Sequence, residues 1–145
     1  MSYTKNPSDK TGIVSTTART KAFSDLNLKL TLHPVRKDIM PLKDDAAIKN
    51  SVKNILLTNF FERPFQPDLG ANLRSLLFEP ADAITRVAIR DSVKNKLIEK
   101  EPRIEDVTVI VENDDANNAY KLTIGFNIKQ IEKTETVEII LKRLR

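Results

Sequence analysis

The sequence contains no cysteine, no tryptophan, a single histidine and only three glycines. Without cysteine there is no disulfide framework, no thiol nucleophile and no thiolate zinc site. A single histidine leaves no second imidazole for a zinc site. Because the chain has neither a G-x-G-x-x-G nor a Walker pattern, glycine-rich loops that cradle phosphates are excluded as well. We therefore expect no cofactor and no bound metal.

Long apolar runs are also missing. None approaches the ~20 residues that a membrane-spanning helix needs, and the N-terminus has no charged-then-apolar signal pattern. The 145 residues, 40% of them apolar, suffice for one compact domain with a real core. We expect a soluble protein that is made in the cytoplasm and has no membrane partner.

Charge of one sign is not concentrated anywhere in the chain. The 24 basic and 20 acidic residues give a net charge of +4, and the two signs are interspersed. A nucleic-acid surface requires a dense basic face, often with aromatic residues beside it. The sequence shows no such block, so we expect no specific nucleic-acid partner.

The N-terminal third predicts an arm followed by a strand. Residues 1–20 are polar and without periodicity, which indicates a flexible arm. Residues 21–145 are expected to form a single domain. Within it a period of two predicts a half-buried strand that His33-Pro34 ends. Its apolar positions are Leu26, Leu28, Leu30 and Leu32.

Three helices are expected in the middle of the chain. The first opens at Pro41 and the acidic pair 44–45 and runs to about Asn59. A short helix is expected over 72–78. A long helix is expected from about Ala81 to Lys100, stopped by Pro102. Its apolar residues fall in two rows, Ile84 with Ala88, and Ile89 with Val93 and Leu97.

Between the first two helices, residues 60–70 contain two prolines and a glycine, which forbid regular structure. Three phenylalanines in this segment predict a loop pinned onto the core. They are Phe60, Phe61 and Phe65.

The last third predicts a sheet. Apolar residues alternate over 107–111, 122–128 and 137–141, and the polar run 113–118 has the chemistry of a hairpin turn. Because the strands and helices are segregated along the chain, the fold class is α+β. We expect an N-terminal strand, two to three helices and a C-terminal three-stranded antiparallel meander packed on the long helix.

A catalytic constellation is hard to assemble from these residues. A Ser-His-Asp triad would have to use His33, which lies beside a proline at a strand end. The acids 114–115 lack the spacing and glycine of a calcium loop and are typical of a hairpin tip. Glycoside hydrolysis needs only two carboxylates. Glu62 is the one acid in an apolar setting, but Arg63 beside it favours the charged form. We expect no enzyme activity.

Two segments together resemble a known family. The first carries Glu62-Arg63-Pro64, then Gly70, then a Leu-Leu-Phe-Glu run at 76–79. The second is Glu101-Pro102-Arg103, at the junction of the long helix and an apolar strand. Over residues 25–145 this order and spacing resemble the baseplate wedge proteins of contractile phage tails. That family also contains the TssE component of the type VI secretion baseplate. The chain departs from it at Phe61 and Leu69, where relatives tend to have a glycine and an aromatic residue.

The resemblance implies a structural role. Members of the family are often called sheath initiators, and some carry a lysozyme-like label. The implied partners are baseplate wedge core proteins and tail sheath subunits, with tube or hub proteins as further candidates, at six copies per baseplate ring. The implied location is the virion tail baseplate, after assembly in the host cytoplasm.

Two surfaces are candidate contacts. Pro102 fixes the backbone, so Glu101 and Arg103 stand on a stiff corner, and Arg103 can form paired hydrogen bonds with a carboxylate. From the residues alone, the two either pair within the chain, face water or bind a partner. The resemblance favours protein binding by Glu101, Pro102 and Arg103. The strand 136–144 is a candidate sheet edge, whose charges either prevent strand addition or select a complementary strand.

Two other functions stay open. One is a cell-wall glycoside hydrolase, in line with the lysozyme-like label, and it predicts activity that one acidic residue controls. The other is a soluble adaptor domain with an unrelated partner, which co-purification with baseplate proteins would distinguish.

Overall fold

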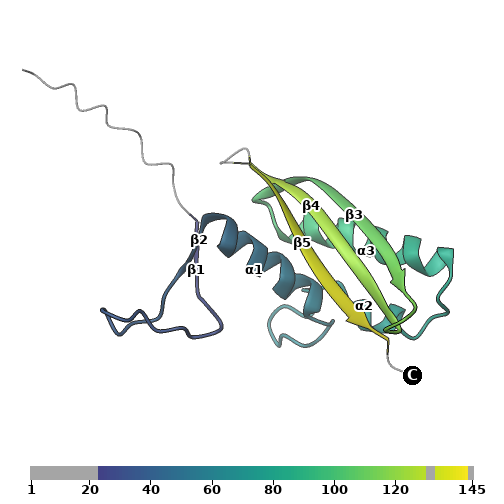
Figure 1. The fold of residues 1–145 in the computed structure, drawn as a ribbon, viewed down its shortest axis with the longest axis horizontal. Coiled ribbons are helices and arrows are strands. Elements are labelled where there is room, and N and C mark those ends of the chain that lie inside the picture. The colour runs from purple at the N-terminus through teal and green to yellow at the C-terminus, as the bar shows by residue number, and fades with distance from the viewer. Residues whose placement is uncertain (1–22, 130–132, 144–145) are drawn as a thin grey trace, which may run out of the picture.

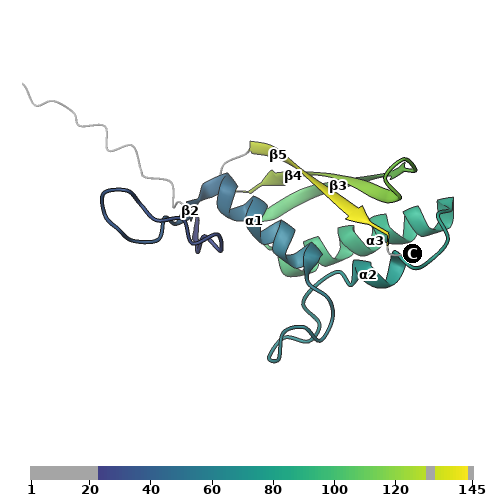
Figure 2. The same cartoon turned by 60° about the horizontal axis from the view of Figure 1, so that its bottom comes forward.

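The computed structural model describes residues 23–129 and 133–143, and the expected arm over 1–20 lies outside this range. A three-stranded antiparallel sheet carries the helices on one face and leaves the other face open (Figures 1 and 2). The α+β prediction is thereby confirmed. In chain order the elements are β1 (Ser24–Asp25), β2 (Leu42–Lys43), α1 (Asp44–Leu57), α2 (Leu73–Leu76), α3 (Ala83–Lys100), β3 (Ile104–Asp114), β4 (Ala119–Ile128) and β5 (Lys133–Lys142).

Helix α1 forms as predicted. Asp44 and Asp45 lie in its first turn, where the positive end of the helix dipole favours carboxylates. The helix ends where the backbone N–H of Thr58 donates to the carbonyl of Asn54 at 3.1 Å, while the Thr58 hydroxyl donates to the same oxygen. The buried face is apolar at helical spacing and consists of Ala47, Ile48, Val52, Ile55 and Leu56.

Helix α3 buries one stripe instead of two. Asp82 caps its N-terminus by accepting a hydrogen bond from the backbone N–H of Thr85 at 2.8 Å. The row Ile89, Val93 and Leu97 is fully buried, as predicted. The predicted row of Ile84 and Ala88 is exposed, because only one side of α3 lies against the sheet.

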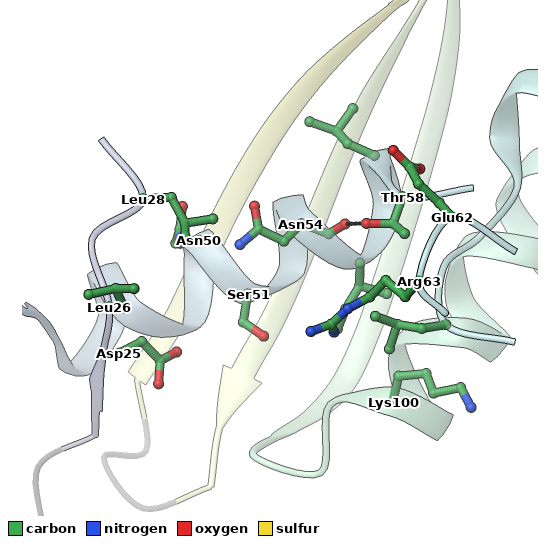
Figure 3. A pocket seen from close by; sticks show the side chains of 13 residues that line it. Asp25, Leu26, Leu28, Asn50, Ser51, Asn54, Thr58, Glu62, Arg63 and Lys100 are labelled. Carbon is green, nitrogen blue, oxygen red and sulfur yellow. Dashed lines mark hydrogen bonds between the residues drawn. The ribbon is translucent and has the colours of Figure 1, made fainter. Parts of the chain in front are cut away.

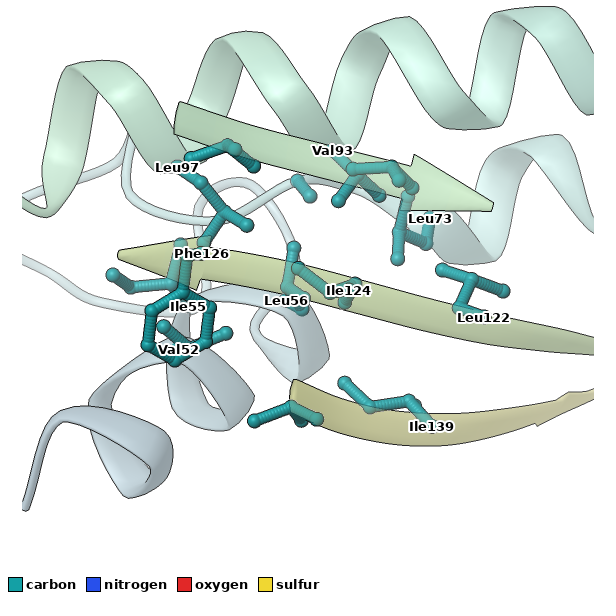
Figure 4. Close-up of a cluster of buried hydrophobic side chains, with 14 of the residues drawn as sticks. Val52, Ile55, Leu56, Leu73, Val93, Leu97, Leu122, Ile124, Phe126 and Ile139 are labelled. Carbon is teal, nitrogen blue, oxygen red and sulfur yellow. The ribbon is translucent and has the colours of Figure 1, made fainter. Parts of the chain in front are cut away.

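The sheet has the order β3-β4-β5, with β4 in the centre. The hairpin between β3 and β4 closes at the pair Asp114 and Ala119, with the turn at the predicted position. From Tyr120 to its end, strand β4 alternates buried and half-buried residues, so every second side chain points at the helices. The core that results lies between the sheet and α1, α2 and α3 (Figure 4). Its largest side chains are Tyr120, Phe126, Ile48, Leu56, Ile89, Leu97, Leu122, Ile124 and Ile128.

The predicted strand over residues 26–32 is wrong. All four leucines are 59–62% exposed, and β1 ends before the first of them. The chain turns instead, with Leu30 at a φ of 52° and its N–H bonded to the carbonyl of Asn27 at 2.9 Å. A period-two pattern buries its apolar face only when a sheet lies against it. Within the described residues, β1 pairs only with the two-residue β2.

The prediction that the loop over 60–70 is pinned to the core by its phenylalanines is also wrong. Phe61 and Phe65 are 83% and 98% exposed, and Phe60 is exposed as well. The loop is held by polar contacts instead. The backbone N–H of Phe61 donates to the carbonyl of Pro67, and Lys100 of α3 forms an ion pair with Asp68. These contacts hold the loop while its aromatic rings project outward.

Candidate functional site

The junction of α3 and β3 is a rigid corner, which we call the elbow, residues 101–103. Helix α3 ends as the N–H of Glu101 donates to the carbonyl of Leu97 at 3.0 Å. Pro102 follows and is exposed, and β3 starts two residues later. On the far side Lys129 donates to the carbonyls of both Pro102 and Arg103. The elbow is therefore fixed to α3, β3 and the end of β4.

Glu101 and Arg103 form an ion pair within the chain. Glu101 is only 3% exposed. Arg103 donates to both of its carboxylate oxygens, from Nε at 2.6 Å and from Nη2 at 2.8 Å. The hydroxyl of Ser51 in α1 donates to the same carboxylate at 2.6 Å. Such a bidentate, charge-assisted arrangement is among the strongest polar contacts in proteins.

The charge of this carboxylate is maintained despite its burial. Burial by itself would raise the pKa of Glu101, but the hydrogen bonds from Arg103 and Ser51 outweigh it and hold the pKa below its ordinary value. The pKa of Arg103 is raised, chiefly by its hydrogen bonds to Glu101. Both groups are therefore ionised at neutral pH.

Arg103 also connects the elbow to the N-terminal segment. Its Nη1 lies 3.3 Å from Oδ2 of Asp25, and its guanidinium carbon lies 5.4 Å from the centre of the Phe23 ring. A cation at this distance over an aromatic ring is attracted to it. The ion-pair network thus joins β1, α1, α3 and β3 at one point.

The sequence left three alternatives for Glu101 and Arg103: pairing within the chain, exposure to water or binding to a partner. In the structure the two side chains pair with each other. Protein binding by Glu101, Pro102 and Arg103 stays a prediction, for which Pro102 and the outer side of the guanidinium offer the accessible surface. No local pattern points to Ser51 or Asp25, which lie 50 and 78 residues from their partners in the chain.

Strand β5 is an edge. Among the described residues it pairs with β4 alone, over the ten positions from Lys133 to Lys142. Its first half is tied to α1, because Lys133 contacts Asp45 at 2.9 Å and Glu135 contacts Lys49 at 2.6 Å. The second half carries Glu138, Ile140 and Lys142 on the open face. Residue 144, the last of the predicted edge 136–144, lies outside the described range.

The candidate catalytic groups are not assembled into a site. Nδ1 of His33 accepts from the backbone N–H groups of Val35 and Arg36 at 3.2 Å each, so this histidine closes a turn. Glu62 is exposed and accepts from the backbone N–H of Asn59 at 2.8 Å. Within 23–129 and 133–143 no three potential metal ligands cluster. No helix in the described part of the chain has the length and apolar character required to cross a membrane.

Comparison with known proteins identifies the family. The model of the family "Baseplate wedge protein gp25" matches residues 43–134, which is more than half of the chain. Baseplate wedge protein gp25 of Enterobacteria phage T4 is 29% identical over 126 residues, which cover 86% of this chain and 92% of that protein.

Solved structures agree on the fold. A candidate tail lysozyme from Geobacter sulfurreducens has a TM-score of 0.63 at 25% identity, covering 68% of this chain and 89% of that one. A chain of the anti-feeding prophage baseplate has a TM-score of 0.55 at 12% identity, covering 86% and 88%. The family match spans α1 to the start of β5 and includes the elbow. This chain therefore belongs to the family of baseplate wedge protein gp25 and is a structural component of a contractile-tail baseplate.

Proposed function

We propose that this protein docks on the wedge core of a contractile phage tail and initiates sheath assembly by offering a sheet edge to strands of the sheath subunits. The observation that carries the proposal is β5, a ten-residue strand with a hydrogen-bonded neighbour on one side only within the described chain. Its other side presents unpaired N–H and C=O groups, which can pair with an incoming strand. Glu138 and Lys142 discourage non-specific pairing and favour a strand of complementary charge.

Hydrogen exchange on mixing with purified sheath subunits tests the edge. The amides of β5 that point away from β4 are solvent-exposed in the free protein and should exchange rapidly. We expect those in 136–142 to gain protection when sheath strands are added, because each acquires a backbone partner. Binding without any change of exchange in β5 would contradict the proposal. Protection confined to β3, the opposite edge, would do so too.

The docking half of the proposal assigns the elbow to the wedge core. Because Glu101 is satisfied within the chain, we assign the contact to the exposed side of Pro102 and Arg103, with Glu101 holding Arg103 in place. A rigid corner loses little conformational freedom on binding, which favours affinity.

A bulky substitution at the corner tests this assignment while it keeps both side chains of the buried ion pair. Pro102→Trp places a large ring at the exposed tip and should lower co-sedimentation with wedge core proteins at least ~10-fold through steric exclusion. Asp115→Trp, at the exposed hairpin tip between β3 and β4, is the matched control and should bind as wild type does. Equal binding by both variants would exclude the elbow from the interface.

We further propose that the protein is not an enzyme. A glycosidase needs a general acid whose pKa is raised by a dry environment. Glu101 is the one buried carboxylate in the described part of the chain, and its pKa is shifted in the opposite direction. Asp25 is paired with Arg103, and Glu62 is exposed to solvent. The lysozyme name of the Geobacter neighbour is therefore not supported here by a catalytic pair.

A further inference from the structure

An open groove of about 620 Å³ runs along α1 beside the elbow (Figure 3). Its floor is the exposed side of α1, where Asn50, Ser51 and Asn54 lie. One wall is the segment that follows β1, and the other is the loop between α1 and α2 together with Lys100 at the end of α3. Leu26 and Leu28 stand on the first wall, and Glu62, Arg63 and Leu69 on the second.

Exposed apolar side chains are concentrated in one part of the chain. In the described residues, ten of the sixteen large apolar side chains that are exposed belong to residues 26–65. Three of the ten, Leu26, Leu28 and Leu57, line the groove, and two of these three are leucines that a sequence-based prediction buries in a strand. Concentrated exposed apolar surface in a soluble protein marks a site of interaction. The ten are Leu26, Leu28, Leu30, Leu32, Val35, Met40, Leu57, Phe60, Phe61 and Phe65.

The floor of the groove indicates the backbone shape of the occupant. Asn50 and Asn54 are one helical turn apart, and neither side-chain amide has a hydrogen-bond partner within residues 23–129 and 133–143. Side chains at this spacing are separated by roughly 5–6 Å. Alternate residues of an extended chain repeat at about 6.6 Å and present N–H and C=O groups on one side. Two primary amides at matching spacing can therefore satisfy the backbone of an extended segment.

A helix would fit the same floor less well. Its backbone groups already bond one another, so it would cover the two amides with apolar side chains and leave them without water or partners. Burying an unpaired amide costs free energy. The pair of half-buried Asn50 and exposed Asn54 thus favours an extended chain over a helix.

The second wall holds one cation that can pair with an occupant, while its carboxylate, Glu62, accepts a hydrogen bond from the backbone N–H of Asn59. Lys100 is paired with Asp68 and Glu99, and Asp25 is paired with Arg103. Arg63 points into the groove (Figure 3) and makes only a 3.4 Å hydrogen bond to the neutral side chain of Gln66. Its guanidinium is the groove's one cation without a carboxylate partner among the described residues. A carboxylate on the occupant would supply that partner.

We infer that this groove binds an extended segment of a wedge core protein, one that carries apolar side chains against Leu26, Leu28 and Leu57 and a carboxylate against Arg63. The inference rests on the proposed function, since it specifies which kind of segment the docked partner contributes. The chain's own residues 1–22 contain four basic residues and one acidic residue, Asp9, which makes them a poor match for Arg63.

Hydrogen bonds connect the elbow directly to the groove. The Glu101 carboxylate fixes Ser51 in the groove floor, and Arg103 fixes Asp25 at the base of the leucine wall. The Glu101–Arg103 ion pair therefore fixes the position of α1, the floor of the groove, relative to the segment after β1, its first wall. The Glu101–Arg103 ion pair is largely buried, but it can affect partner binding because it positions the residues that form the groove.

Co-sedimentation with the wedge core proteins of the same particle tests the inference. Arg63→Glu replaces attraction by repulsion, and Asn50→Leu combined with Asn54→Leu removes both amides; each should weaken binding roughly 10- to 100-fold. Arg86→Glu makes the same charge change on α3, outside the groove, and should leave binding unchanged. All variants are checked for wild-type circular dichroism and melting temperature.

A photo-crosslinking residue in place of Leu28 identifies the occupant. The expected product joins this position to a partner segment that contains an acidic residue. Crosslinks to residues 1–22 of the same chain, or to partner segments without acids, would overturn the inference. The inference would also be overturned if the wild-type protein binds the wedge core and both groove variants, Arg63→Glu and the double asparagine variant, bind it with the same affinity. Failure of the wild-type protein to bind the wedge core would instead overturn the proposed function.

Discussion

Arg103→Ala is expected to lower the free energy of unfolding by about 3 kcal/mol at pH 7, because removing one member of a buried ion pair leaves the other charged and unpaired. The partner in question is Glu101, which is 3% exposed and accepts two hydrogen bonds from the guanidinium. Urea denaturation followed by circular dichroism measures the difference. A loss below about 0.5 kcal/mol would show that the pair contributes little to the folded state.

The same variant has a pH signature. In the wild type the pKa of Glu101 is lowered on folding, so its contribution to stability is present above the unfolded pKa of about 4.3 and is lost as the pH falls through the folded pKa. In Arg103→Ala the burial remains without the guanidinium, which raises the folded pKa instead. The stability gap between wild type and variant should therefore shrink as the pH falls from about 7 towards about 3, first because the variant's Glu101 becomes protonated and then because that of the wild type does. A gap that stays constant from pH 7 to pH 3 would rule out Glu101 as its source.

Destabilisation by Arg103→Ala can reduce partner binding even if Arg103 does not contact the partner. A variant that loses about 3 kcal/mol has a lower melting temperature and a looser groove, so reduced partner binding by Arg103→Ala does not by itself place Arg103 in the interface. Pro102→Trp and Arg63→Glu avoid this problem, because Pro102 and Arg63 are exposed and outside the buried pair.

Gly70→Ala is expected to be the second severe change, costing about 2–4 kcal/mol. Gly70 has a φ of +113°, which side chains rarely tolerate, and a Cβ there would lie 2.3 Å from the carbonyl oxygen of Thr58. That oxygen belongs to the residue that ends α1, so the clash cannot be relieved without shifting the helix end and the loop behind it.

Gly125→Ala is the matched control. Gly125 lies in the central strand β4, and a Cβ there would meet no atom within 4 Å. The same change of one methyl group should therefore be within about 0.5 kcal/mol of neutral, since alanine loses less conformational entropy than glycine in a strand. Equal melting temperatures of the two variants would contradict the backbone geometry at Gly70.

The regular elements could be predicted because their signals are local. The acidic first turn of α1 and Pro102 after α3 are each read from a few neighbouring residues. The alternation in β4 and β5 was reliable because both strands lie on the same helical layer.

The errors arose where burial depended on distant structure. The leucines over 26–32 have the pattern of a strand, but no sheet lies against them. The phenylalanines over 60–65 are apolar, yet the core is already filled by α1, α3 and the sheet. The local sequence does not distinguish an apolar residue that is buried in the core from one that stays exposed and is available to a partner.

The candidate site was predicted only in part. The elbow residues 101–103 stand out as a motif, but their partners Ser51 and Asp25 come from α1 and β1. The groove likewise combines residues from four separate stretches of sequence, so only the folded chain brings Asn50 and Asn54 opposite Arg63.

Sheath assembly on wedge cores that lack this protein tests the central claim most directly. Cores prepared without it are mixed with sheath subunits, with and without the purified protein, and sheath rings are counted by electron microscopy. We predict rings only where the protein is added, with none when Pro102→Trp replaces it. Equally frequent rings on cores without the protein would contradict the proposal that it joins the baseplate to the sheath.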